Sequence, residues 1–153
     1  MTKSKKWEIK GLKKNSKLCT SAKLILKTRI DYLFESIEIY FIKLDAESLH
    51  NIRIALRRVR YNMELYIDCF NRNKFFTIYK KVQLLQDLSG EVRDLDVFKL
   101  NTETLKSEEK IKINKSVIIG VERKRKTLED SLKLELMKFI HNKSVKNFYK
   151  LLN

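Results

Sequence analysis

No proline interrupts this chain of 153 residues, and glycine occurs only three times. Both residues break helices and are enriched in turns, so the sequence holds few of the breakers that a many-stranded fold needs. Lys, Leu, Ile and Glu are abundant instead. This composition favours long helices, and the length suits one domain that buries a sizeable core.

Apolar residues that recur every three or four positions indicate where the helices lie. The expected helices cover about 16–44, 46–70, 72–88 and 93–105, then about thirty residues after 112, and finally 144–152. Asp45 is expected to cap the second helix and Gly90 to end the third. Residues 1–15 are expected to form a flexible basic arm, either a solubilising tail or a segment docked through Trp7, and residues 16–153 the helical domain.

The segment from Leu49 to Tyr66 divides into two unlike faces when it is read as a helix. One face is an apolar stripe suited to a core, made of Leu49, Ile52, Leu56, Val59 and Met63. The other face, which we name the cationic row, carries His50, Arg53, Arg57 and Arg60. Arg58 lies just off the edge of this row.

The cationic row has two interpretations at this stage. A solvated basic face is the ordinary one, although arginines at these spacings repel one another. An anion-binding face explains why the row uses Arg in a chain that otherwise prefers Lys, because Arg suits bidentate contacts with phosphate. His50, one of only two histidines, is expected in the first turn of its helix, where free N–H groups favour negative charge.

Two blocks of this sequence resemble the hallmarks of a known family. The first block, residues 49–60, reads Leu-His-x-x-Arg-Ile-Ala-x-Arg-Arg-x-Arg, and the second, residues 90–97, reads Gly-x-x-Arg-Asp-Leu-Asp-Val. The residue types in the two blocks, and the order of the blocks along the chain, are similar to the signature of the CHAD family, the conserved-histidine α-helical domains. The resemblance spans roughly residues 16–140.

This resemblance implies an all-α fold and binding of inorganic polyphosphate in a basic channel. We expect an up-and-down bundle of four to five antiparallel helices. CHAD domains usually contain two similar helical halves, each with a His-Arg motif, whereas this chain has one motif and covers about one half. Either the single half binds on an open basic surface, or two copies pair as a homodimer and rebuild the channel, which we favour.

Basic residues outside the row are further candidate ligands. Besides the row, the expected polyphosphate site includes Arg58, Arg93, Lys23, Lys27, Arg123 and Lys126. Arg93 is the best candidate outside the second helix, whereas Lys23 and Lys27 fit a solvated flank better than the anion site. Asp94 and Asp96 are expected either to brace arginines of the second helix or to satisfy free N–H groups at a helix start.

The net charge of +15 should attract polyanions in a salt-dependent way. It is unevenly distributed: residues 1–29 carry ten Lys and Arg against one acid, whereas residues 30–105 carry eleven against twelve. The cationic row is therefore a local concentration within a nearly neutral region.

Cys19 and Cys69 lack metal-ligand spacing and are expected to be a reduced pair in an intracellular protein. No apolar run reaches the length of a membrane span or forms a secretory signal, so the cytoplasm is the expected location. The resemblance to the CHAD family extends this expectation to association with polyphosphate granules. Gly-rich phosphate loops, nucleophile motifs and metal-ligand clusters are not recognisable. We therefore expect a binding protein without catalytic activity, cofactor or metal.

Two other functions remain open from the sequence. The charge and the interspersed aromatic residues permit binding of RNA or another nucleic acid, although the aromatic residues follow core spacing rather than a stacking platform. A scaffold whose basic face docks an acidic partner is the third interpretation.

Overall fold

The computed structural model describes residues 8–153, and within this range the chain is helical without any strand. The helices are α1 (Leu18–Lys43), α2 (Ala46–Leu65), the 3₁₀ helix η1 (Ile67–Cys69), α3 (Arg72–Glu108), α4 (Lys115–His141) and α5 (Lys143–Lys150). Trp7, the expected docking residue of the basic arm, lies outside the described residues. The all-α expectation is confirmed.

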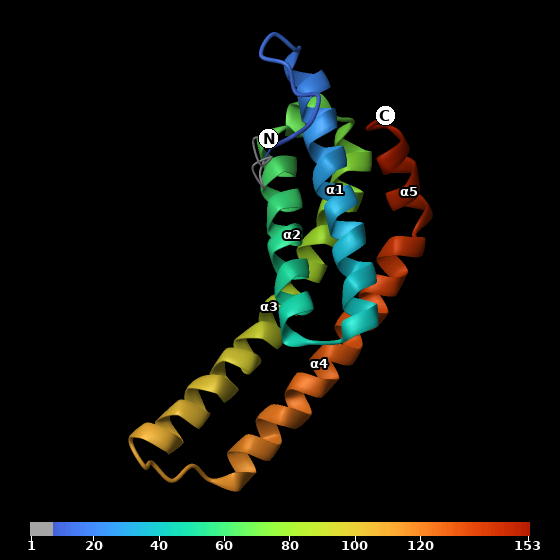
Figure 1. The fold of residues 1–153 in the computed structure, drawn as a ribbon. Coiled ribbons are helices and arrows are strands. Elements are labelled where there is room, and N and C mark those ends of the chain that lie inside the picture. Colours follow the sequence, from blue (N-terminus) through green and yellow to red (C-terminus); the bar gives the residue numbers. More distant parts are fainter. Residues whose placement is uncertain (1–7) are drawn as a thin grey trace.

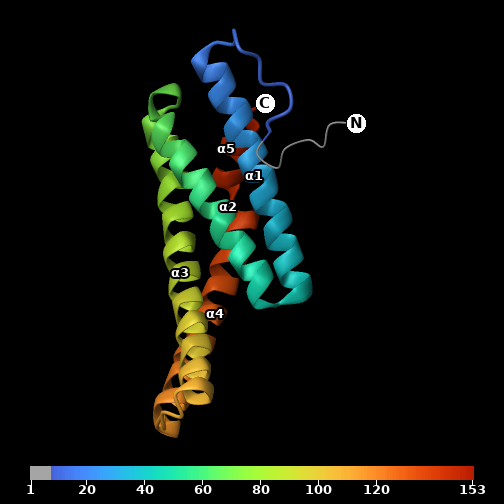
Figure 2. The same ribbon diagram turned by 60° about the vertical axis from the view of Figure 1, so that its left-hand side comes forward.

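Four helices form an antiparallel bundle, in which α1 packs on α2, α2 on α3, and α3 on α4 (Figure 1). The second view shows α2 between α1 and α3 (Figure 2). The short helix α5 continues from the end of α4 in the same general direction and packs on α3 and α4 (Figure 1). Within residues 8–153, no helix combines the length and apolar character that crossing a bilayer requires.

The helix starts follow from polar residues that satisfy free backbone N–H groups. The Asp45 carboxylate accepts a hydrogen bond from the Ser48 N–H at 2.8 Å, which confirms Asp45 as the N-cap of α2. Side chains of Asn71, Asn114 and Asn142 cap α3, α4 and α5 in the same way. Between α1 and α2 the chain turns at Leu44, whose φ of 51° is left-handed and ends the first helix.

The core is built around the apolar stripe of α2, all of which is buried. Buried residues of the other helices close around it: Leu26, Leu33 and Ile37 of α1, Ile78, Val82 and Leu85 of α3, and Leu132 and Leu136 of α4. Leu18, Phe76 and Val117 share the apolar spacing of their helices, which predicts burial, but they are 67%, 41% and 45% exposed. The second α-helix also ends earlier than expected, at Leu65, and continues as η1.

Gly90 does not end a helix, and this expectation is wrong. The helix α3 runs without a break through Gly90 and through the second sequence block, so Asp94 and Asp96 lie in mid-helix rather than at a helix start. A glycine costs about 1 kcal/mol within a helix, which buried neighbours can offset. Ser89 and Val92 are such neighbours, since both are buried on the face that packs on the bundle.

The expectation of two reduced thiols is also wrong, because Cys19 and Cys69 form a disulfide. The bond links the first turn of α1 to η1, across 50 residues of sequence. In an antiparallel hairpin the start of the first helix lies beside the end of the second, which is how α1 and α2 bring the two cysteines together.

The halves of α3 and α4 nearest their connecting loop project beyond the bundle as a pair of helices (Figure 1). We name this pair, residues 93–131, the arm. Thr102 is the only buried residue of the arm. Large apolar side chains of the arm are instead exposed: Val97, Phe98, Leu100, Leu105, Ile111, Val117 and Ile119.

Candidate functional site

The cationic row lies on the flank of α2 beside its buried stripe, on the side of α3. His50 and Arg57 are exposed, whereas Arg53 and Arg60 are partly buried against α3. Because α2 begins at Ala46, His50 lies in the second turn and not in the expected first turn. The free N–H groups at the start of α2 therefore contribute less to an anion at His50 than the sequence implied.

The two flanking arginines of the row are held by acidic or phenolic groups. The Nη1 of Arg53 lies 3.6 Å from the Asp94 carboxylate on α3. Arg60 donates from Nε to Glu64 at 2.9 Å and to the hydroxyl of Tyr79 at 3.2 Å. Tyr79 in turn donates to Glu64 at 2.6 Å, and this hydrogen bond, with that from Arg60, lowers the pKa of the Glu64 carboxyl.

The centre of the row carries a cation without a counter-charge. Within residues 8–153, no carboxylate lies within 4 Å of Arg57. Its guanidinium lies 5.7 Å from the ring centroid of Tyr61, an exposed neighbour one turn along α2. A cation over an aromatic face keeps its charge available to an anion, so Arg57 is the most accessible positive charge in the row.

The remaining arginine of the first sequence block points elsewhere. The charge of Arg58 acts on Arg29 of α1, so Arg58 lies on the α1 side of α2, whereas Arg53 and Arg60 contact α3. Arg93 is partly buried on α3, next in sequence to the Asp94 that contacts Arg53. The structure thus brings Arg93 to the level of the row and sets Arg58 apart from it.

Lys23 and Lys27 are not brought to the row. Both line a cleft of about 590 Å³ between the start of α1, the segment before it and the end of the chain. Lys27 Nζ lies 6.0 Å from the ring centroid of Tyr149 on α5. A cluster of two lysines therefore exists on the α5 side of α1, separate from the arginines of α2.

Arg123 and Lys126 of α4 are exposed, and their neighbour Arg125 is the basic residue that turns inward. Arg125 donates from Nε to Asp96 and from Nη1 to Glu129, the latter at 2.8 Å. The hydrogen bond to Asp96 is the main reason that the pKa of Arg125 is raised. Sequence reasoning missed Arg125, although its spacing of three and seven residues from Leu128 and Leu132 puts it on the packed face of α4.

The proposed bracing of α2 by two acids is half right. Asp94 contacts Arg53 as expected, but Asp96 pairs with Arg125 of α4. Tyr40 of α1 joins the same cluster by donating to Glu129 at 2.8 Å. Asp96, Arg125, Glu129 and Tyr40 thus tie α1, α3 and α4 together where the arm leaves the bundle.

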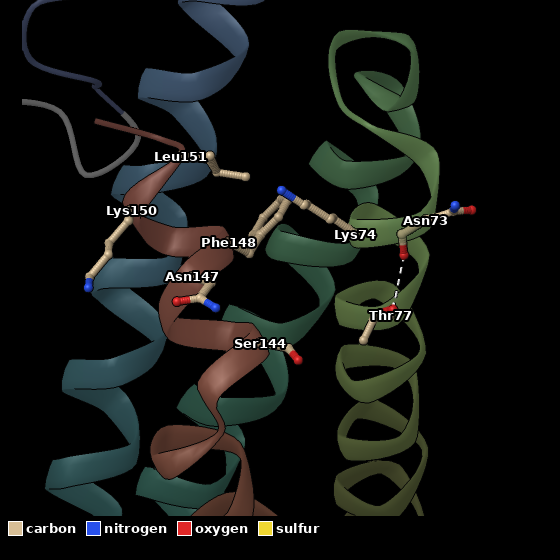
Figure 3. Close-up of a pocket in the computed structure, with 8 residues that line it drawn as sticks. All are labelled: Asn73, Lys74, Thr77, Ser144, Asn147, Phe148, Lys150 and Leu151. Atoms are coloured by element: carbon tan, nitrogen blue, oxygen red, sulfur yellow. Dashed lines mark hydrogen bonds between the residues drawn. The ribbon is translucent and has the colours of Figure 1, made fainter.

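A separate groove of about 530 Å³ lies between α3 and α5 (Figure 3). It is lined by Asn73, Lys74 and Thr77 on α3 and by Ser144, Asn147, Phe148, Lys150 and Leu151 on α5. Figure 3 shows Lys74 reaching toward Phe148, whereas Thr77 is occupied by a hydrogen bond to the Asn73 carbonyl. No residue of the expected polyphosphate site lines this groove.

Comparison with known families decides the family of this chain. The sequence model of the CHAD domain matches residues 12–134. The chain belongs to the CHAD family. Comparisons with curated proteins and with solved structures each gave no match. CHAD domains are associated in general with polyphosphate binding and act as binding domains that are not catalytic by themselves. Among residues 8–153 of this chain, no group of three or more His, Cys, Asp or Glu side chains is placed to hold a metal ion.

Proposed function

We propose that this CHAD domain binds inorganic polyphosphate along the outer face of α2, without catalysing a reaction. The observation that carries the proposal is the cationic row itself, four basic residues on one helix face with an unneutralised Arg57 at its centre. Residues three or four apart on a helix repeat about every 5–6 Å. Successive phosphates of a chain can therefore contact successive members of the row.

Each member of the row has a role in this proposal. Arg57 makes the first contact, because it is exposed and has no carboxylate within 4 Å among residues 8–153. The Arg53 guanidinium lies 3.6 Å from the Asp94 carboxylate, and this ion pair is weak enough for a phosphate to compete with Asp94 for Arg53. His50 is exposed and donates a hydrogen bond to a phosphate oxygen. Arg93 supplies a further positive charge from α3, while Arg58, Lys23, Lys27, Arg123 and Lys126 contribute mainly to long-range attraction.

The test is retention on immobilised polyphosphate. We expect the double variant Arg53→Ala/Arg57→Ala to lose retention while keeping its helical circular dichroism signal. The variant Lys110→Ala/Lys112→Ala is the matched control, since it removes the same charge from exposed residues between α3 and α4 and should keep retention. Equal retention by both double variants would show that the row is not the site.

Competition distinguishes this function from the two alternatives. Polyphosphate should displace a bound RNA at a much lower phosphate concentration than RNA displaces polyphosphate. Displacement in the opposite order would favour a nucleic-acid-binding protein. Polyglutamate that competes as well as polyphosphate would favour a scaffold for an acidic partner.

We also propose that two copies pair through the arm. The support is the arm's surface, which exposes seven large apolar side chains and buries only Thr102. Exposed large apolar side chains are enriched at association surfaces, and a two-fold interface would let each copy bury those of the other. Light scattering should give about twice the monomer mass of 18.3 kDa, and Leu100→Glu/Ile119→Glu should restore the monomer. A wild-type monomer at micromolar concentration with polyphosphate present would contradict the pairing.

A further inference from the structure

The seam between α1 and α5 is held by side chains. The backbone of α1 packs on α2, whereas that of α5 packs on α3 and α4. Tyr149 of α5 makes the link to α1, because its ring lies 5.9 Å from the ring of Phe34 and its hydroxyl donates to the Asp31 carboxylate. The two helices therefore meet at one aromatic contact and are not closely packed along their length.

Two hollows lie along this seam, and Asn153 lines both of them. The first is the cleft of about 590 Å³ that reaches Lys27. Besides Asn153, the second, of about 500 Å³, is lined by Phe34, Glu38, Ile140, Lys146, Tyr149 and Lys150. Asp31, the partner of Tyr149, falls between the α1 residues that line the two hollows. We name the two hollows together the α1–α5 groove.

The floor of the α1–α5 groove is apolar. Leu12 and Leu24 line the first hollow, and Phe34, Ile140 and Tyr149 line the second. Leu12 is 46% exposed, and the other four are only partly buried. Apolar hollows of several hundred Å³ are typical of sites that cover the side chains of a ligand or partner.

The rim of the groove is basic. Lys23 and Lys27 border the first hollow, and Lys146 and Lys150 border the second. Within residues 8–153, no carboxylate lies within 4 Å of any of these four amines. In Figure 3 the Lys150 side chain extends from α5 toward α1. The rim thus presents four unneutralised positive charges around an apolar floor.

We propose that the α1–α5 groove docks an acidic amphipathic peptide segment of a partner protein. The acidic side chains of such a segment pair with the lysine rim, and its apolar side chains enter the two hollows. From Lys23 to Glu38 the groove follows α1 for about 22 Å, a length that suits a helix of about four turns. A bare polyanion fits this groove less well, because it leaves the apolar floor exposed to water.

The groove is separate from the cationic row, and the proposal does not depend on polyphosphate binding. The row lies on the side of α2 that contacts α3, whereas the groove lies between α1 and α5. Glu38 is the one acidic residue that lines the groove, and it is exposed. Removing its charge should therefore favour an acidic partner.

Fluorescence anisotropy tests the rim, with a fluorescein-labelled synthetic peptide in which pairs of Glu alternate with Leu and Phe. We expect Lys27→Ala/Lys146→Ala to weaken binding roughly tenfold at low salt. The control Lys110→Ala/Lys112→Ala loses the same charge outside the groove and should bind like the wild type, whereas Glu38→Gln should bind more tightly. Equal affinity of the two double variants would overturn the proposal.

The floor is tested with polyglutamate of equal charge, which should bind several-fold more weakly than the mixed peptide. Leu12→Ser, a change at an exposed position, should weaken binding of the mixed peptide and leave that of polyglutamate unchanged. Equal binding of the two peptides by the wild type would show that only charge matters and would refute the groove.

The variant Arg53→Ala/Arg57→Ala distinguishes the groove from the row. It should bind the mixed peptide with wild-type affinity even if it has lost polyphosphate, and it should bind equally well if polyphosphate binding proves absent from the protein. Loss of the peptide in this variant would place the peptide on the row. Displacement of the peptide from this variant by polyphosphate or RNA at equal charge would show a general polyanion site. Either result would contradict the proposal.

Discussion

The carboxylate of Asp94 lies 3.6 Å from the guanidinium of Arg53, so α3 places a negative charge beside the cationic row of α2. The Asp94 side chain is 76% exposed and makes no other ion pair among residues 8–153. An exposed pair of this kind contributes only about 0–1 kcal/mol to stability. Asp94 is therefore better described as a competitor for Arg53 than as a rigid brace.

Replacing Asp94 with Asn should tighten polyphosphate binding. Removing one negative charge a few ångströms from the ligand is worth about 1 kcal/mol in water, or roughly fivefold in affinity at low salt. Fluorescence titration at two salt concentrations measures the change, which should shrink at high salt. Asp68→Asn is the charge-matched control, since Asp68 pairs with Arg72 away from the row. Weaker binding by Asp94→Asn would instead support the bracing role.

Replacing Arg125 with Met should destabilise the junction between the bundle and the arm. The substitution leaves the Asp96 and Glu129 side chains, which are 14% and 13% exposed, without their guanidinium partner. Removing one member of a largely buried pair costs about 3 kcal/mol of unfolding free energy. Urea denaturation measures it, and exposed Arg123→Met should change stability by only about 0.5 kcal/mol. Equal losses in the two variants would contradict the assignment.

The stability of the protein should fall in acid partly through Glu129. Burial alone would raise the pKa of this carboxyl, but the hydrogen bond from Tyr40 and the charges of Arg125 and Lys133 lower it below its ordinary value of 4.5. A depressed folded-state pKa means that the stabilisation is present above about 4.5 and is lost as pH falls through the folded value. Unfolding free energies at pH 6 and pH 3.5 should therefore differ less in Glu129→Gln than in the wild type. Exposed Asp130→Asn should leave the difference unchanged.

Removing the disulfide should destabilise the α1–α2 hairpin. A bond that closes a loop of 50 residues restricts the unfolded chain by about 4 kcal/mol in the entropic treatment, and measured losses are about 2–5 kcal/mol. Cys19→Ser/Cys69→Ser should show this loss in urea denaturation. A reductant should lower the wild type to the same level and leave the double variant unaffected. A wild type insensitive to reductant would show that the thiols are not bonded.

Replacing Gly90 with Ala should stabilise the protein by about 0.5–1 kcal/mol, because Ala restricts the unfolded chain and favours the helix. A Cβ at Gly90 would meet nothing within 4 Å, and the same holds for Gly120 of α4, whose Ala variant is the control. If the phosphate chain crosses α3 at Gly90, only Gly90→Ala will also weaken retention on polyphosphate. Destabilisation of Gly90→Ala would mean that α3 needs the glycine for its path.

The spacing of apolar residues was enough to predict the helices that bury one uniformly apolar face. The buried face of α2 and its cap at Asp45 were predictable because one side of that helix is uniformly apolar and a capping residue precedes it. The continuity of α3 could not be predicted, because a glycine followed by acidic residues, as at Gly90, is also typical of one helix ending and another starting. Packing of Ser89 and Val92 against the bundle outweighed that signal.

The division of the basic residues among surfaces could be predicted only in part. The shared face of His50, Arg53, Arg57 and Arg60 follows from helical spacing. Arg58 turns toward α1 because α1 packs on one side of α2 and α3 on the other. The spacing of residues along one helix does not show on which side each neighbouring helix lies. The pairing of Cys19 with Cys69 likewise depends on the hairpin that α1 and α2 form.

The helix α3 is a single span of 37 residues, about 55 Å long at the standard helical rise. One continuous helix therefore belongs both to the bundle and to the arm. Asp94 lies on this helix where the arm begins. We expect docking of a second copy on the arm to shift α3, and with it the Asp94 carboxylate beside Arg53. Association at the arm and anion affinity at α2 should then depend on each other, because the coupling between two binding equilibria is reciprocal.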